Sequence, residues 1–314
     1  MPDRRWTRDS VPDQAGRTAV VTGGNTGLGF ELARLLAERG ASVMLVCRSS
    51  DKAEEAAGRI RADVRGAQIS TVQMDQGSLD SVRAAAAAIA GDHERIDLLV
   101  NNAGMMGSRE RRTSPDGSEL TFATNHLGVF AFTGLLLDRV LSTSGSRIVT
   151  MSSISNARAR LDLDDLQAAA GYNRNAAYSR SKLANLMFAY GLQHRLTAAG
   201  QSTLSLAAHP GQSRTDFTRD LGAFGRFVYG PRARSFTGLV MQDKSIGVLA
   251  AARAATDPDA AGGNYYGPSG LFQLTGYPVK VGSNEQSRDR AAQDRLWTAS
   301  EQLTGITYPP RTTP

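Results

Sequence analysis

Short runs of β-branched and aliphatic residues alternate with longer Ala- and Leu-rich segments along this chain. Expected strands lie at residues 18–22, 42–46, 69–74, 96–101, 146–151, 203–208 and 271–274. Expected helices lie at 28–39, 51–65, 78–90, 118–141, 176–198 and 245–256. Alternation at this spacing indicates βαβ units, and strands without polar alternation indicate a sheet covered on both faces. We therefore predict an α/β fold with a doubly wound parallel sheet of about seven strands.

A single domain over residues 1–314 is predicted, because no internal repeat and no linker rich in Pro, Gly or Ser interrupts the chain. Two long segments, 154–175 and 212–240, follow expected strands and have no clear helix or strand pattern. Such segments at the carboxyl edge of a parallel sheet are often binding loops, and the apolar residues of 212–240 suggest a substrate lid. A last amphipathic helix is expected at about 286–303, where Leu296, Trp297 and Leu303 give an apolar face.

The net charge of +6 and the pI near 9.7 raise the possibility of nucleic-acid binding. Basic residues nevertheless alternate with acidic ones, and no Lys/Arg run with interleaved aromatics is present, so no nucleic-acid partner is expected. The one cysteine, Cys47, excludes an intrachain disulfide and fits a reducing compartment. Apolar runs such as 129–137 are too short to span a bilayer, and the first residues lack an apolar signal-peptide region. A soluble cytoplasmic protein without a membrane anchor is the expectation.

A glycine-rich stretch, TGGNTGLG at 22–29, follows the first expected strand and opens the first helix. Glycines at positions 23, 27 and 29 allow a tight turn and a close backbone approach to a pyrophosphate, which the amides of a helix N-terminus favour. A phosphate-binding Walker A loop is excluded, because Phe30 and Glu31 stand where Lys and Ser or Thr are needed.

The second expected strand ends in Cys47 and Arg48, where enzymes that use NAD usually carry an acid for the ribose hydroxyls. An arginine fork matches a 2′-phosphate, and Ser49 can add a hydroxyl donor. The sequence therefore predicts NADP(H) rather than NAD(H), although a surface arginine at the start of a helix is the plainer interpretation of Arg48 alone.

Tyr178 and Lys182 lie four residues apart in the stretch AAYSRSKLAN, which predicts one helical face for both. A cation close to the phenol favours the phenolate and lowers its pKa from about 10, which suits acid/base catalysis. Spacing alone does not separate this hypothesis from a surface Tyr beside a surface Lys.

Six motifs occur in order: TGxxxGxG at 22–29, NNAG at 101–104, Asn125 in TNHLG, TMSS at 150–153, YxxxK at 178–182 and HPG at 209–211. Together they resemble the short-chain dehydrogenase/reductase family, with its Rossmann fold, over roughly residues 15–280. The stretches KLAN, NHLG and YYGPSG are similar to the retinol-dehydrogenase-like and protochlorophyllide-reductase-like branch, notably to actinobacterial oxidoreductases.

The resemblance implies roles for particular residues. Tyr178 would be the acid/base, Lys182 its partner, Ser153 the donor that orients the carbonyl and Asn125 the holder of a relay water. Asp75 would bind the adenine amino group and Thr215 the nicotinamide carboxamide. The full implied cofactor set is Gly23, Asn25, Thr26, Gly27, Leu28, Gly29, Arg48, Ser49, Asp75, Asn101, Ala103, Gly104, Tyr178, Lys182, Pro210, Gly211, Ser213 and Thr215.

The expected function is an NADPH-dependent oxidoreductase that interconverts a carbonyl and an alcohol on an apolar small molecule. Two alternatives remain at this point: a C=C reductase of the protochlorophyllide-reductase type, and a non-catalytic NADPH-binding regulatory protein. The four histidines show no metal-ligand spacing, so no metal is expected. A homo-oligomer is possible, because family members often assemble through the helices that bear Asn125 and Tyr178.

Overall fold

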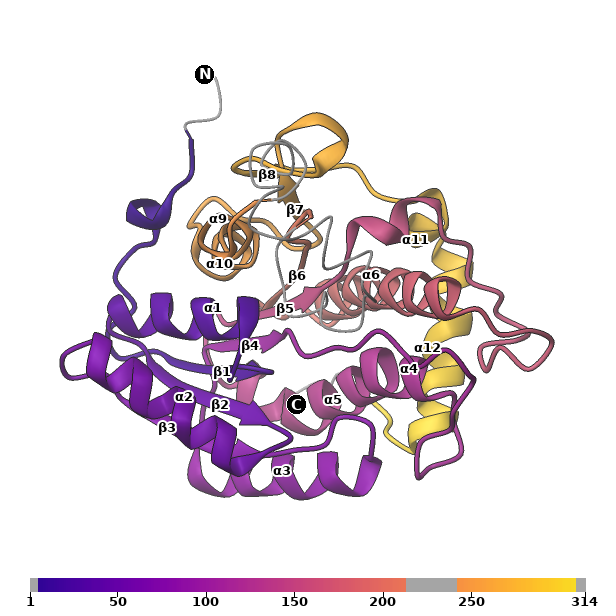
Figure 1. Cartoon of the computed structure of the whole chain (residues 1–314), viewed down its shortest axis with the longest axis horizontal. Coiled ribbons are helices and arrows are strands. Elements are labelled where there is room, and N and C mark those ends of the chain that lie inside the picture. Colours follow the sequence, from indigo (N-terminus) through magenta and orange to yellow (C-terminus); the bar gives the residue numbers. More distant parts are fainter. Residues whose placement is uncertain (1–4, 213–241, 309–314) are drawn as a thin grey trace.

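An eight-stranded sheet forms the centre of the computed structural model, which describes residues 5–212 and 242–308 (Figure 1). Its order is β3-β2-β1-β4-β5-β6-β7-β8, with parallel pairing except between β7 and β8. The strands are β1 (Thr18–Thr22), β2 (Ser42–Cys47), β3 (Ile69–Gln73), β4 (Leu98–Asn101), β5 (Arg147–Met151), β6 (Leu204–Ala208), β7 (Tyr265–Pro268) and β8 (Pro278–Lys280). The predicted doubly wound sheet is confirmed, with one strand more than expected.

The strand expected at 271–274 is wrong. Leu271–Gln273 forms a single turn of 3-10 helix, η6, in the loop between β7 and β8. Phe272 and Gln273 have left-handed φ values of 52° and 57°, which a strand does not contain. The Gly270 amide donates to the Thr275 carbonyl at 2.8 Å and closes this loop. The apolar residues of the stretch therefore belong to a closed turn and not to a strand of the sheet.

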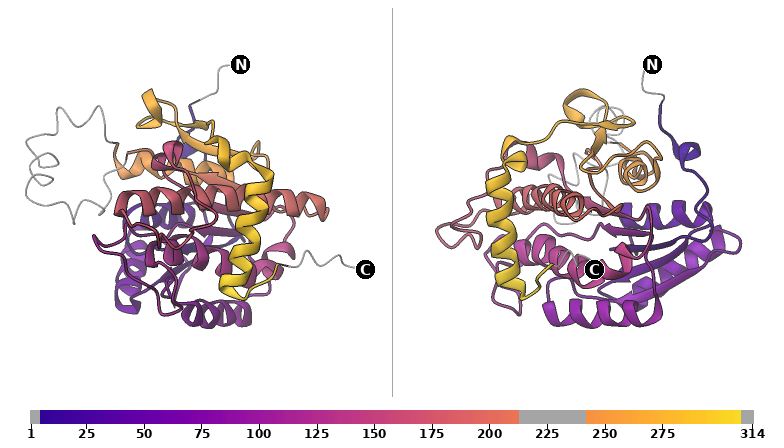
Figure 2. Two further views of the ribbon diagram at one scale, coloured as in Figure 1. Left: turned by 90° about the vertical axis from the view of Figure 1, so that its right-hand side faces the viewer. Right: turned by 180° about the vertical axis from the view of Figure 1, so that it is seen from behind.

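Helices cover both faces of the sheet (Figures 1 and 2). On one face α1, α2 and α10 pack around Ala19 and Val21 of β1, and on the other α3, α5, α6 and α12 pack around Val20. Successive residues of a strand point to opposite faces, so a continuous apolar strand serves two cores at once. The helical elements are η1 (Arg8–Ser10), α1 (Gly27–Glu38), α2 (Ser50–Asp63), α3 (Leu79–Asp92), α4 (Leu120–Phe122), η2 (Ala123–Leu127), α5 (Gly128–Leu141), η3 (Ile154–Arg158), α6 (Arg174–Ala198), α9 (Lys244–Gly247), α10 (Leu249–Thr256), α11 (Glu285–Arg288) and α12 (Arg290–Thr304).

The expected C-terminal helix is present but divided. α11 ends before Asp289, whose side chain caps α12 by accepting a hydrogen bond from the Ala292 amide at 3.1 Å. Trp297 of α12 packs between Phe130 of α5 and Phe188 of α6, at ring-centre distances of 5.1 and 5.8 Å. The C-terminal helix is therefore part of the core layer on this face.

Among the described residues, one helical stretch, Leu120–Leu141, is long and apolar enough to cross a membrane. In this fold 78% of its most apolar window is buried, as in the core helix of a globular protein.

Candidate active site

The glycine-rich loop joins β1 to α1 through a very close backbone contact. Gly23 and Gly27 have φ values of 66° and 61°, a region that favours glycine. A Cβ on Gly29 would lie 2.3 Å from the Gly23 carbonyl oxygen and 2.4 Å from Asn102 Nδ2. Glycine at these positions therefore allows the turn and the close packing of α1 against the loop, and the first-turn amides of α1 suit a pyrophosphate.

The NNAG stretch after β4 is bonded directly to this loop. Thr22 Oγ1 accepts from the amides of Asn102 and Ala103 at 3.0 and 2.9 Å, and Asn102 Nδ2 donates to the Thr22 carbonyl at 2.8 Å. Asn101 instead is buried and donates to Thr133 Oγ1 of α5 at 2.9 Å, so it steadies the sheet. Asn102 was not among the predicted residues, and its place one residue beyond a strand end was the available signal.

The end of β2 also contacts the glycine-rich loop. The buried Cys47 thiol accepts hydrogen bonds from backbone amides of that loop, and burial raises its pKa to about 11. Arg48 follows, exposed, and its guanidinium has no hydrogen bond or ion pair among the described residues. Ser49 caps α2 by accepting from the Lys52 amide at 3.4 Å. Within the described residues, an unpaired cation thus directly follows the residue that contacts the loop.

The end of β3 turns back toward NNAG. Asp75 is exposed, and its Oδ1 accepts from the Gly77 amide at 2.9 Å, which fixes the turn. Gln76 donates to the carbonyls of Ala103 and Thr124 at 3.3 and 2.6 Å. The predicted cofactor residues that follow β1, β2, β3 and β4 consequently share one edge of the sheet.

Tyr178, Lys182 and Ser153 come together at this edge. Asn173 caps α6 by accepting from the amides of residues 175 and 176, which fixes the start of the helix just before Tyr178. Ser153, at the end of β5, hydrogen-bonds to the Tyr178 side chain, and Lys182 Nζ lies 5.8 Å from the centre of the Tyr178 ring. A Cβ on Gly104 would lie 3.0 Å from Lys182 Nζ, so NNAG also borders the cluster.

The electrostatics differ from the sequence expectation. Burial raises the pKa of Tyr178, and the Ser153 hydrogen bond lowers it by less. The Lys182 ammonium donates to the Met151 carbonyl at 3.2 Å, and burial lowers its own pKa to about 8. The predicted lowering of the phenol pKa is therefore wrong for the protein alone, because the effect of burial outweighs that of the Ser153 hydrogen bond.

Asn125 lies in a π-helical turn, η2, between α4 and α5. Its side chain accepts from the Met105 amide at 2.7 Å and donates to the Met105 carbonyl at 2.8 Å. It also donates to Ser181 Oγ at 2.9 Å, and Ser181 donates to the Tyr178 carbonyl at 2.7 Å. Ser181, which the sequence analysis missed, thus joins Asn125 to the helix of Tyr178, and π-turns are frequent at functional sites.

Of the two serines after β5, Ser152 makes structural hydrogen bonds and Ser153 faces the site. Ser152 is 4% exposed, donates to the Lys182 carbonyl at 2.7 Å and accepts from Asn156 at 3.1 Å. Ser153 is half-buried and hydrogen-bonds to Tyr178. This arrangement agrees with the choice of Ser153 for the substrate side.

Comparison with known proteins gives the family. The profile described as short chain dehydrogenase matches residues 17–224. The chain belongs to the short-chain dehydrogenase family. Human retinol dehydrogenase 13 is 35% identical over 309 residues, which is 96% of this chain and 90% of that protein, and mouse retinol dehydrogenase 12 is 34% identical over 296 residues, which is 93% and 88%.

Solved structures of the same fold agree. An uncharacterised protein of Mycobacterium paratuberculosis is 36% identical, with a TM-score of 0.79 over 97% of this chain and 99% of that one. The NADP complex of Pseudomonas aeruginosa RhlG is 25% identical, with a TM-score of 0.67 over 83% and 98%.

In this short-chain dehydrogenase the HPG segment is held by the β7–β8 loop. Gly211 has φ 65°, and a Cβ there would lie 2.3 Å from the Leu274 carbonyl oxygen. The Pro210 carbonyl accepts from Gln242 at 2.6 Å, while His209 Nε2 lies 2.9 Å from Gln273 Oε1. The predicted residues Ser213 and Thr215, and the predicted lid at 212–240 beyond its first residue, lie outside the described residues.

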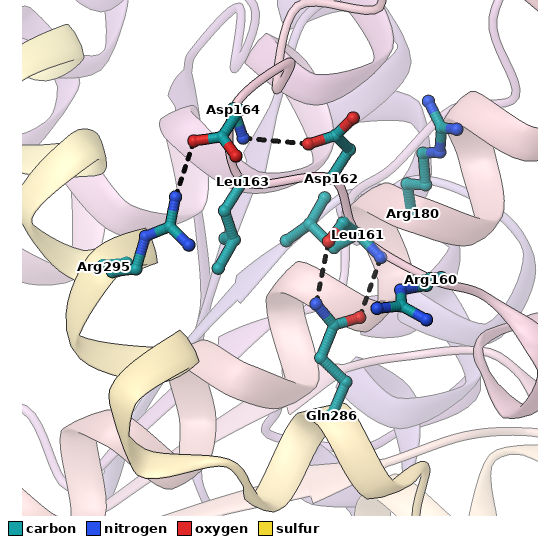
Figure 3. A pocket seen from close by; sticks show the side chains of 8 residues that line it. All are labelled: Arg160, Leu161, Asp162, Leu163, Asp164, Arg180, Gln286 and Arg295. Carbon is teal, nitrogen blue, oxygen red and sulfur yellow. Dashed lines mark hydrogen bonds and ion pairs between the residues drawn. The ribbon is translucent and has the colours of Figure 1, made fainter.

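The insert at 154–175 borders an open cavity of about 460 Å³ between itself, α6, α11 and α12 (Figure 3). Gln286 clamps the insert through two hydrogen bonds to the Leu161 backbone, at 2.9 and 2.8 Å, and Arg295 pairs with Asp164 at 2.7 Å. Arg180, which also lines the cavity, lies about 200° around the helix from both Tyr178 and Lys182. This part of the insert therefore packs on the side of α6 away from Tyr178 and Lys182.

Within residues 5–212 and 242–308, no three His, Cys, Asp or Glu side chains gather as a metal site.

Proposed function

We propose that this short-chain dehydrogenase is an NADPH-dependent oxidoreductase that reduces a carbonyl, or oxidises the alcohol, of an apolar small molecule. The observation that carries the proposal is the convergence of Ser153, Tyr178 and Lys182 beside the glycine-rich loop. Three strand ends, the N-terminus of α1 and the catalytic helix meet there, as a hydride-transfer site requires.

The cofactor would lie along this edge, with its pyrophosphate on the α1 amides and its 2′-phosphate at Arg48 and Ser49. Arg48 is exposed and unpaired among the described residues, so its guanidinium can form a bidentate pair with a phosphate. No acid stands at the end of β2, where one would repel that phosphate. The NADP complex of RhlG supports the same choice by similarity.

Bound NADPH would supply the hydride that a carbonyl carbon needs. The side chains of this protein then have to place the carbonyl oxygen and protonate it. Ser153 can donate a hydrogen bond to that oxygen and stabilise the charge that develops on it. Tyr178, whose pKa is raised, keeps its proton at neutral pH and can donate it to the same oxygen.

With the cofactor bound, the Lys182 ammonium would keep the pKa of the Tyr178 phenol in a range that allows proton transfer. Its ammonium has three donors, and one is used on the Met151 carbonyl. The others can hold ribose hydroxyls of the cofactor and favour the phenolate that remains after proton transfer. The π-turn at Asn125 leaves the regular helical hydrogen-bond pattern and is the natural place for the water that returns a proton to Tyr178.

An apolar substrate is supported by two side chains on the β7–β8 loop. Leu271 and Phe272 are 78% and 75% exposed, on a turn with left-handed backbone. The Gln273–His209 bond ties this turn to the HPG segment, next to the strand end that carries Ser153. These two adjacent side chains offer an apolar surface that an apolar substrate can cover. Similarity to retinol dehydrogenases makes retinal a suitable first substrate.

The test is NADPH consumption with all-trans-retinal and a series of aldehydes and ketones, for the wild type and for Tyr178→Phe. We expect turnover by the wild type and a loss of about 10²- to 10⁴-fold in the variant, with unchanged NADPH affinity. Tight NADPH binding without turnover on any carbonyl would instead favour a regulatory protein.

A further inference from the structure

A buried polar chain runs from Lys182 to the C-terminal helix. Lys182 Nζ and Asn185 Nδ2, three residues apart on α6, both donate to the Met151 carbonyl at 3.2 Å. Both side chains are at most 4% exposed. A carbonyl oxygen has two lone pairs, so these two donors use both of its positions for accepting hydrogen bonds.

The next member of the chain is His126, which follows Asn125 in the π-turn. Its side chain is fully buried and interacts with the side chain of Asn185. On its other side, His126 Nε2 lies 2.9 Å from Ser300 Oγ of α12. α12, the yellow helix of Figure 2, packs against both α6 and the π-turn.

The donors and acceptors of this chain can be assigned. The Ser300 hydroxyl donates to the Leu296 carbonyl at 2.7 Å, so its oxygen accepts from His126 Nε2–H. His126 Nδ1 then carries a lone pair near the side chain of Asn185, whose amide donates to Met151 and whose other polar atom is Oδ1. Both atoms are buried and lack a hydrogen bond in this arrangement. A shift of one proton to Nδ1, with the Ser300 hydroxyl turned to Nε2, would satisfy both.

We propose that Asn185 and His126 are positioning residues for the Lys182 ammonium, and that Ser300 makes the C-terminal helix part of this support. Asn185 holds one lone pair of the Met151 carbonyl, which leaves Lys182 one bond on that oxygen and its other protons for the cofactor. His126 fixes Asn185 and the turn that carries Asn125, so the lysine and the proposed relay are set by one buried network. This inference rests on the proposed function, because it assigns Lys182 to the cofactor.

The first test replaces Asn185 by Leu in the full chain and measures the NADPH dissociation constant and kcat separately. We expect NADPH affinity to fall about tenfold, the effect of one well-placed hydrogen bond. Leu192→Ala is the matched control, since Leu192 is buried on the same helix outside the network. Its thermal stability should fall by a comparable amount while NADPH affinity stays within about twofold.

A second pair of variants decides the matter if Asn185→Leu does not fold. His126→Gln can supply a donor toward Ser300, as Nε2–H does, and His126→Asn can supply one toward Asn185, as the tautomer with its proton on Nδ1 would. We expect each to retain more NADPH affinity than His126→Phe, which keeps the ring volume and neither donor. Equal affinity in all three would overturn the inference.

A third variant, Lys182→Met, distinguishes failure of the positioning network from failure of the proposed function. Lys182→Met should itself weaken NADPH binding, and if it does not, the assigned role of Lys182 is wrong. If Lys182→Met weakens binding but Asn185→Leu behaves like Leu192→Ala, only the positioning network is refuted.

Discussion

The ammonium of Lys182 lies 5.8 Å from the centre of the Tyr178 ring and donates to the Met151 carbonyl. The Lys182 ammonium thus lies close to the Tyr178 phenol and is held in place by the backbone of β5. Burial has opposite effects on the two groups: it raises the pKa of Tyr178 and lowers that of Lys182 to about 8. Both effects favour the uncharged forms. The ribose hydroxyls of a bound cofactor would favour the ammonium of Lys182, and the positive ring of the oxidised cofactor would favour the phenolate of Tyr178.

NADPH affinity should therefore depend on pH through Lys182. The charged form binds the ribose, so affinity is expected to be constant below about pH 8 and to fall as pH rises through that value. The stability of the cofactor-free protein should change in the other sense. The folded pKa is below the unfolded value of 10.5, so the unfolded state binds more protons between these values and stability through this group rises with pH. Fluorescence titrations of NADPH across this range check the first point, and Lys182→Met should abolish the dependence.

The serine pair gives a matched comparison. Ser153→Ala removes the donor to the carbonyl oxygen and should lower kcat by about 10²-fold, with little effect on melting temperature. Ser152→Ala removes a buried bond to the Lys182 carbonyl and should cost about 1 to 2 kcal/mol of folding free energy, with a smaller effect on kcat. Equal kinetic effects of the two substitutions would contradict the assignment of Ser153.

Much of this fold follows from the sequence. The first six strands are rich in β-branched and aliphatic residues, and the six expected positions agree with β1 to β6 within a few residues. The last hairpin could not be predicted, because YYGP in β7 lacks a strand pattern and is held by pairing with Ala207 and Ala208 of β6. Leu271 and Phe272 imitate a buried strand because they are apolar, yet they are exposed.

The site was predicted less completely than the fold. Motif residues such as Ser153 and Tyr178 are recognisable by type and order, and the structure brings them together. Asn102, Ser181 and Asn185 were missed because their importance lies in which backbone groups they reach, a property of tertiary structure. The burial of the Tyr178 side chain is equally invisible in a spacing of four residues, so the pKa expectation for Tyr178 was wrong.

Arg48 should decide between the two nicotinamide cofactors. Arg48→Ala is expected to raise the KM for NADPH by about ten- to a hundredfold, since a charge-assisted bond to phosphate is lost, and to leave the KM for NADH unchanged. Arg61→Ala is the control, because Arg61 lies near the other end of α2 and carries the same charge. A wild type that uses NADH more tightly than NADPH would contradict the preference.

The glycine-rich loop should reject a single methyl group at one position. Gly29→Ala places a Cβ 2.3 Å from the Gly23 carbonyl oxygen, so α1 has to move from the loop. NADPH affinity should fall by at least about tenfold, because the first-turn amides of α1 are displaced from the position where they would bind the pyrophosphate. Gly58→Ala in α2 meets no atom within 4 Å and should stabilise the protein by about 0.5 to 1 kcal/mol, with unchanged binding. Isothermal calorimetry and thermal melts separate the two results.

Leu271 and Phe272 should govern the affinity for large apolar substrates. Burying such a side chain contributes about 1.5 to 3 kcal/mol, so replacing both by Ser should raise the KM for a long apolar aldehyde at least about tenfold. The KM for NADPH and the rate with a short aldehyde should not change, because Leu271 and Phe272 are not among the predicted cofactor-binding residues. Stability should also be unchanged, since both side chains are mostly exposed in the protein alone. Leu303→Ser on α12, where the side chain is 38% exposed, is the control for loss of surface apolar area. Kinetics with a series of aldehydes of increasing length measure the effect, and an equal change at every length would place these two residues outside the substrate path.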